Sequence, residues 1–95
     1  MERVDLIDKI LKEKLGALHV EIIDDSHRHK GHKNGGGGHF SLTVVSSQFE
    51  NVNLIDRVRM VYAALDEQIS VEPKVIHALQ IKTYTPEQWD KVESN

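Results

Sequence analysis

Residues 39–44 read His39-Phe40-Ser41-Leu42-Thr43-Val44, so polar and apolar side chains alternate strictly. Successive side chains of a β-strand point to opposite faces of a sheet, and this period of two predicts a strand with one buried face. Residues 18–23 alternate in the same way, with Leu18, Val20 and Ile22 on one face. Because consecutive strands usually pair, we expect a hairpin.

Helices are predicted on both sides of this hairpin. Residues 4–15 place apolar side chains at helical spacing, and Gly16 suits the left-handed position that follows many helices. After Asn53, a good helix cap, residues 54–69 carry a second apolar stripe. The members of this stripe are Leu54, Ile55, Val58, Val61, Tyr62, Leu65 and Ile69.

The last third of the chain predicts one more strand and one more helix. Residues 70–74 interrupt the second helix, and residues 75–84 read as a strand. A threonine cap, a proline at the first position and a glutamine three residues after the cap then mark a helix start at residues 85–88. We expect Trp89 to anchor this helix on the core. The prediction is one compact α/β (α+β) domain over residues 1–95, ordered α-β-β-α-β-α, with helices covering one face of a three-stranded sheet.

Composition narrows the function classes. The 95 residues, 39% of them hydrophobic, suffice for one small core. The absence of cysteine excludes disulfides and thiolate ligands, and a reducing interior is expected. No apolar run approaches the roughly 20 residues of a membrane span, so we expect a cytoplasmic protein, in a bacterial cytosol or an organelle matrix. The formal charge of −3 argues against a dedicated nucleic-acid binder but leaves a local basic patch open.

Residues 25–38 form a long histidine- and glycine-rich connection between the first two strands. His27, His29 and His32 lie within it, and four consecutive glycines at residues 35–38 favour a mobile loop. Histidine is a common metal ligand and titrates near neutral pH, so metal capture or proton sensing is one interpretation. The spacings match no strong metal signature, and a solvated polar loop is the other interpretation.

A further histidine, His77, falls in the third predicted strand, where alternation places it on the face of Leu79 and Ile81. It could be a structural histidine with a hydrogen-bonded ring, or a ligand that pairs with a loop histidine. Two imidazoles do not complete a structural zinc site, so Asp24, Asp25 or a partner would have to contribute. An enzyme is not expected, because no nucleophile elbow surrounds Ser26 and the glycine run lacks a phosphate-loop ending.

Short segments that follow one another in a fixed order cover nearly the whole chain. They are Val20-Glu21-Ile22-Ile23-Asp24-Asp25-Ser26, Gly38-His39-Phe40, Val44-Val45-Ser46, Phe49-Glu50, Arg59-Met60-Val61-Tyr62, Ile76-His77-Ala78-Leu79 and Tyr84-Thr85-Pro86-Glu87-Gln88-Trp89. In this order and spacing they resemble the BolA family. The resemblance implies a fold similar to the type II KH domain. It also implies a heterodimer with a monothiol glutaredoxin that bridges a [2Fe–2S] cluster, in which the glutaredoxin cysteine and glutathione supply sulfur ligands.

The remaining cluster ligands are implied to be a strand histidine and a loop histidine or cysteine of the BolA-like chain. The strand histidine matches His77, and His29 is the best match in the loop, with His27 and His32 as alternates. The chain would be a monomer without a cofactor when alone. Histidine in place of thiolate should raise the cluster's potential and make its stability depend on pH, because protons compete with iron.

The resemblance also implies an alternative function, DNA binding. Some BolA-like proteins act as transcriptional regulators in the control of stress responses and cell morphology. Arg57, Arg59, Lys74 and Lys82 could contact phosphates of duplex DNA, or could form only surface salt bridges. One position departs from the family, because Val58 stands where a histidine is usual, and any partner contact made by that histidine is in doubt.

Overall fold

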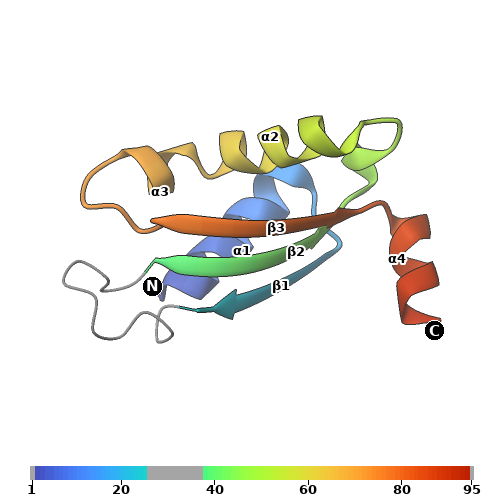
Figure 1. Cartoon of the computed structure of the whole chain (residues 1–95), viewed down its shortest axis with the longest axis horizontal. Helices are drawn as coiled ribbons and strands as arrows, with labels where there is room; N and C mark the ends of the chain where they lie inside the picture. The colour runs from blue at the N-terminus through green and yellow to red at the C-terminus, as the bar shows by residue number, and fades with distance from the viewer. Residues whose placement is uncertain (1, 26–37, 95) are drawn as a thin grey trace.

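The computed structural model describes residues 2–25 and 38–94. Its sheet contains β1 (His19–Asp24), β2 (His39–Val45) and β3 (Ala78–Tyr84), in that spatial order. β1 and β2 pair antiparallel, which confirms the predicted hairpin, whereas β3 runs parallel to β2 (Figure 1). Parallel neighbours need a crossover connection, and the helical segment between β2 and β3 supplies it.

The alternation in β2 separates the two faces of the sheet as predicted. Phe40, Leu42 and Val44 are buried in the core, and the side chains between them lie on the opposite face. Leu42 pairs with Ile22 of β1 and with Ile81 of β3, so the apolar face is continuous across all three strands.

α1 (Arg3–Leu15) follows its prediction closely. Ile7, Leu11 and Leu15 lie one helical turn apart and are all buried against the sheet. The helix ends at Gly16, which has a left-handed φ of 59° and donates its N–H to the Leu11 carbonyl. This is the backbone conformation for which glycine has no Cβ penalty.

α2 (Leu54–Ala64) begins as predicted, because the Asn53 side chain accepts a hydrogen bond from the Asp56 N–H at 2.8 Å. The prediction of one helix through Ile69 is wrong, since α2 ends at Ala64 and a short α3 (Asp66–Ser70) follows after Leu65. The break places the Gln68 carbonyl where it accepts hydrogen bonds from the two N–H groups of residues 75–76. A tertiary contact therefore overrides the helical period.

The predicted apolar stripe of the second helix is only partly buried. Val61 and Leu65 are fully buried, but Leu54, Ile55 and Tyr62 are 65%, 67% and 42% exposed. α2 therefore has one apolar side in the core and a second one at the surface.

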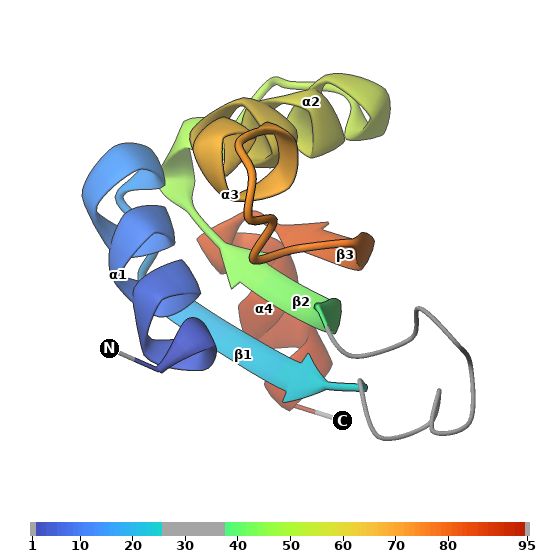
Figure 2. The same ribbon diagram turned by 90° about the vertical axis from the view of Figure 1, so that its left-hand side faces the viewer.

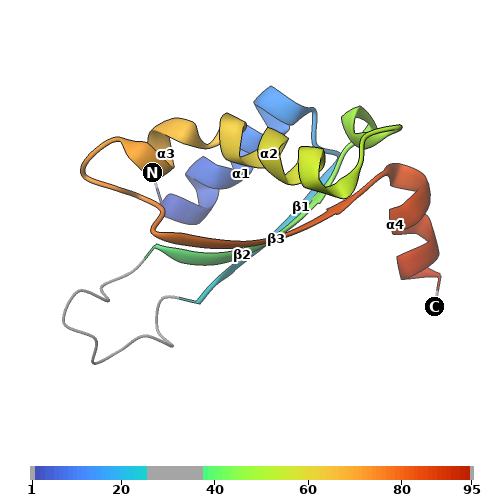
Figure 3. The same ribbon diagram turned by 45° about the horizontal axis from the view of Figure 1, so that its top comes forward.

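The helices lie on both sides of the sheet. α1 packs over β1 and α2 over β3 on one face, while α4 (Pro86–Glu93) leaves the end of β3 toward the other face (Figures 2 and 3). Trp89 of α4 stacks on His19 with ring centroids 5.0 Å apart and lies 5.2 Å from Tyr84. The expectation that Trp89 anchors α4 on the core is wrong, because it packs on the sheet face opposite the core.

Candidate functional site

Only some of the predicted site residues belong to the described part of the chain. His27, His29 and His32 lie outside the described residues, and the prediction of a mobile loop at residues 25–38 falls almost wholly there. His77 is described, and so are the two positions that flank the undescribed segment, Asp25 and Gly38.

His77 lies immediately before β3, so its predicted position inside the strand is wrong. β3 begins at Ala78, because the N–H groups of His77 and Ala78 both donate to the Gly38 carbonyl, at 2.7 and 3.0 Å. A shared acceptor interrupts the regular ladder at this point. The side chain of His77 is exposed.

Gly38 brings the backbone of β2 directly against the His77 side chain. Its φ of 80° lies in the left-handed region, and a Cβ at this position would lie 2.6 Å from His77 Cδ2. Real Cβ atoms do not approach so closely, so only glycine permits this contact. The His77 ring is thus seated on the last backbone unit before β2.

Asp25 and Gly38, which flank residues 26–37, lie at the same end of the sheet as His77. On the β1 side, the Asp25 N–H donates to the His39 carbonyl at 2.7 Å. On the β2 side, Gly38 contacts His77. The two described residues that flank this segment therefore both lie at the end of the sheet where His77 lies.

The His77 imidazole forms no hydrogen bond or ion pair with any residue of the described ranges 2–25 and 38–94. The Asp25 carboxylate, considered above as a further ligand, accepts a hydrogen bond from Ser41 Oγ at 2.6 Å. No group of three histidine, aspartate or glutamate side chains that could hold a metal occurs among the described residues. What the described chain offers here is one exposed, unbonded donor ring.

The four predicted phosphate contacts do not gather into one patch. Burial contradicts the prediction for Arg57, which is only 6% exposed. Its Nε donates to the Val52 carbonyl and its Nη1 to Gln88 Oε1, both at 2.8 Å, so its role is structural. Arg59 is exposed and pairs with Asp56 at 3.1 Å.

The other two members of that set, Lys74 and Lys82, are exposed. Lys74 precedes β3, whereas Lys82 lies within β3 and pairs with Thr43 on the face opposite the core. Of the four predicted contacts, Lys82 therefore belongs to β3 and Lys74 lies shortly before it.

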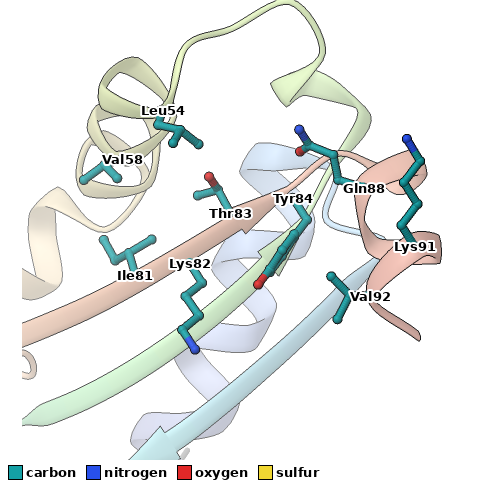
Figure 4. Close-up of a pocket in the computed structure, with 9 residues that line it drawn as sticks. All are labelled: Leu54, Val58, Ile81, Lys82, Thr83, Tyr84, Gln88, Lys91 and Val92. Carbon is teal, nitrogen blue, oxygen red and sulfur yellow. The ribbon is translucent and has the colours of Figure 1, made fainter. Parts of the chain in front are cut away.

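A groove that the sequence did not reveal runs between α2, β3 and α4 (Figure 4). It has a volume of about 530 Å³. Leu54 and Val58 extend from α2 toward Ile81 of β3, and Val92 of α4 closes one end (Figure 4). The signal in the sequence was the width of the apolar stripe on residues 54–69, which exceeds what one buried side needs.

Comparison with known proteins identifies the family. Residues 11–88 match the family described as BolA-like protein. The chain belongs to the BolA family. This confirms the predicted membership and the predicted α/β fold with its three-stranded sheet.

Individual relatives agree with this assignment. The chain is 44% identical to Protein BOLA2 of Arabidopsis thaliana over 87% of its own length and 78% of that protein. It is 33% identical to the DNA-binding transcriptional regulator BolA of Escherichia coli, over 93% and 84% of the two chains. The solved structure of BolA1 from Arabidopsis thaliana superposes with a TM-score of 0.77 at 32% identity, covering 92% of this chain and 95% of that one. None of the described helices is long and apolar enough to cross a membrane.

Proposed function

We propose that this BolA family member is a non-catalytic adaptor in iron–sulfur cluster trafficking or iron sensing. It would bind a monothiol glutaredoxin as a heterodimer and co-ligate a bridging [2Fe–2S] cluster, in a cytosol or an organelle matrix. The observation that carries the proposal is the His77 imidazole, which is exposed and without a hydrogen-bond partner among the described residues.

The donor chemistry of this end of the sheet fits a shared cluster. Imidazole replaces thiolate on one iron in known [2Fe–2S] centres, so the absence of cysteine from the chain is compatible with this role. His77 would be one ligand, and a histidine of residues 26–37 would be the second, with His29 preferred over His27 and His32. The bound cluster supplies one-electron redox chemistry and is itself the cargo of the adaptor.

The protein's own contribution is to position the ring. The hydrogen bond from the His77 N–H to the Gly38 carbonyl fixes the backbone at 2.7 Å, and the close approach of Gly38 supports one side of the ring. A metal-ligating side chain whose backbone is already held in place loses little conformational entropy when it binds. The second ligand would come from residues 26–37, which precede Gly38 in the chain.

The test is reconstitution of the purified chain with a monothiol glutaredoxin, iron, sulfide and glutathione. The wild-type chain should give a heterodimer with a visible absorption and circular dichroism spectrum that changes in His77→Ala. His19→Ala is the matched control, because His19 lies at the opposite end of the sheet with Nε2 2.8 Å from Glu21 Oε2.

Single replacements of His27, His29 and His32 by alanine identify the second ligand in the same assay. Only one of the three should reproduce the effect of His77→Ala, and we expect it to be His29→Ala. A spectrum and a heterodimer affinity that His77→Ala leaves unchanged would remove His77 from the site.

The name of the Escherichia coli relative supports a second candidate, a DNA-binding transcriptional regulator. In this chain the phosphate contacts would be limited to Arg59, Lys74 and Lys82, which are exposed. Duplex DNA binding would then weaken with rising salt. Replacing Lys82 by alanine would reduce the slope of the logarithm of the binding constant against the logarithm of salt concentration by about one. A binding curve that does not respond to salt argues against this role.

A further inference from the structure

β3 is a terminal strand of the sheet, and no described strand pairs with its outer edge. Within residues 2–25 and 38–94 it pairs only with β2. The Ala78 N–H donates to Gly38 and the Tyr84 carbonyl accepts from Ser46, so these two residues direct their backbone groups toward β2. In a parallel ladder both polar groups of a residue point the same way and alternate along the strand. The outward-directed backbone groups therefore belong to Leu79, Ile81 and Thr83.

The α2–β3–α4 groove lies directly along this edge. Its helix side is apolar, with Leu54 and Val58 of α2 next to Ile81. Leu54 is 65% exposed and Val92, at the far end, is 44% exposed. Unpaired strand edges and exposed apolar side chains both favour association, and here they occur together.

The groove is positively charged although the whole chain carries a formal charge of −3. Among the described residues that line it, only Lys82 and Lys91 are charged. Lys82 forms no ion pair with any described residue, and Lys91 forms only an exposed, 3.7 Å contact with Glu87. Contacts of that kind contribute little stability, so both ammonium groups are available to a ligand of opposite charge.

We propose that this groove binds an extended peptide segment of a partner protein in which acidic and apolar residues alternate. The segment would add to β3 as a fourth strand and hydrogen-bond to Leu79, Ile81 and Thr83. Side chains of an added strand alternate between the two faces. Those on the helix side would enter the apolar groove beside Leu54, and those between them would lie on the face of Lys82.

The charge pattern disfavours a second copy of this chain as the occupant. Antiparallel pairing of two β3 edges about Ile81 would bring both Lys82 side chains to one face of a continuous sheet. Like charges in such positions repel, and lysine on an edge strand is a common means of preventing self-association. The proposal is also independent of the cluster, because neither His77 nor any other histidine of the described ranges lines the groove.

The experiment is an NMR titration of the isotope-labelled full chain with a synthetic peptide of about seven residues, a typical strand length, that alternates glutamate with valine or leucine. The expected result is shifted amide signals and slower hydrogen exchange at Leu79, Ile81 and Thr83. Two peptides serve as controls: one with lysine in place of glutamate, and one with the same composition in separate acidic and apolar blocks. Neither should produce these changes.

Two matched variants of the chain test whether the positive charge of Lys82 contributes to peptide binding. Lys82→Glu should weaken binding of the alternating peptide about fivefold, the size of one exposed ion pair. Lys74→Glu changes the same charge outside the groove and should leave the affinity unchanged. Equal binding of the block peptide, an equal loss in both variants, or edge amides that respond to a duplex DNA oligonucleotide but not to the peptide would each overturn the proposal.

Discussion

Two basic side chains, one near each end of β3, are in opposite situations. Near the C-terminal end, Arg57 of α2 is buried, and its guanidinium connects the Val52 carbonyl to Gln88 of α4. At the N-terminal end of β3, His77 is exposed, and its ring is unbonded within the described chain. Buried polar groups contribute to folding only when they are paired, whereas an exposed unpaired donor costs little and remains available. The difference separates a residue whose contacts stabilise the fold from one whose ring remains available to a ligand.

The largest expected effect is at Arg57. Arg57→Ala leaves the Val52 carbonyl and the Gln88 amide oxygen each without one donor and removes packing on Phe49, whose ring lies 5.9 Å from the guanidinium carbon. Two hydrogen bonds to a charged group should make the loss about 2–3 kcal/mol in the free energy of unfolding, measured by urea denaturation.

Arg59→Ala on the same helix is the control for Arg57. Its side chain is 77% exposed, and its contact with Asp56 should contribute less than about 1 kcal/mol. Equal losses in the two variants would show that the contacts of Arg57 have no special role.

An intermediate effect is expected at Gly38. Gly38→Ala places a Cβ 2.6 Å from His77 Cδ2 and 2.9 Å from both the His77 nitrogen and the Val75 carbonyl oxygen, at a φ of 80°. Backbone strain of this kind costs about 1–3 kcal/mol, and the His77 ring must also move. Thermal unfolding measures the cost, and the chemical shift of His77 reports the displacement.

Gly16→Ala separates conformation from steric contact in that experiment. Gly16 also has a positive φ, but an added Cβ would meet only the end of the Gln48 side chain at 3.3 Å. Gly16→Ala should therefore be the milder change and leave the His77 signals in place. A shift of the His77 signals in Gly16→Ala would contradict the assignment of the effect to local contact.

The smallest effect on stability is expected from His77→Ala. The side chain is exposed and forms no described hydrogen bond, so the free energy of unfolding should change by less than about 0.5 kcal/mol. Urea denaturation of the isolated chain measures this change. A loss comparable to that of Arg57→Ala would mean that His77 is a structural residue, and would weaken the proposed ligand role.

The local signals in the sequence predicted most of the fold. The alternation at residues 39–44 marked β2, and Gly16 and Asn53 marked the end of α1 and the start of α2. The Thr85 capping box is also present, with hydrogen bonds of 3.2 and 3.0 Å between Thr85 and Gln88. Each of these features depends on residues close together in the chain, which is why sequence reasoning reached them.

Three of the wrong predictions involve contacts between distant segments. The burial of Arg57 depends on Gln88, 31 residues away, and a helical period does not reveal such a partner. The start of β3 depends on Gly38, and the face chosen by Trp89 depends on His19. For the candidate site, the resemblance indicated His77. It did not indicate that the His77 ring lacks a hydrogen bond within the described residues, nor that a groove runs along β3.

The stack of Trp89 on His19 gives the protein an intrinsic optical probe. Trp89 is the only tryptophan in the chain, and its ring packs between α4 and the sheet face opposite the core. Its emission therefore reports whether α4 remains docked on the strands, without an added label. Val92 of the same helix closes one end of the groove. The emission of Trp89 therefore also reports whether the helix that forms this end of the groove stays in place.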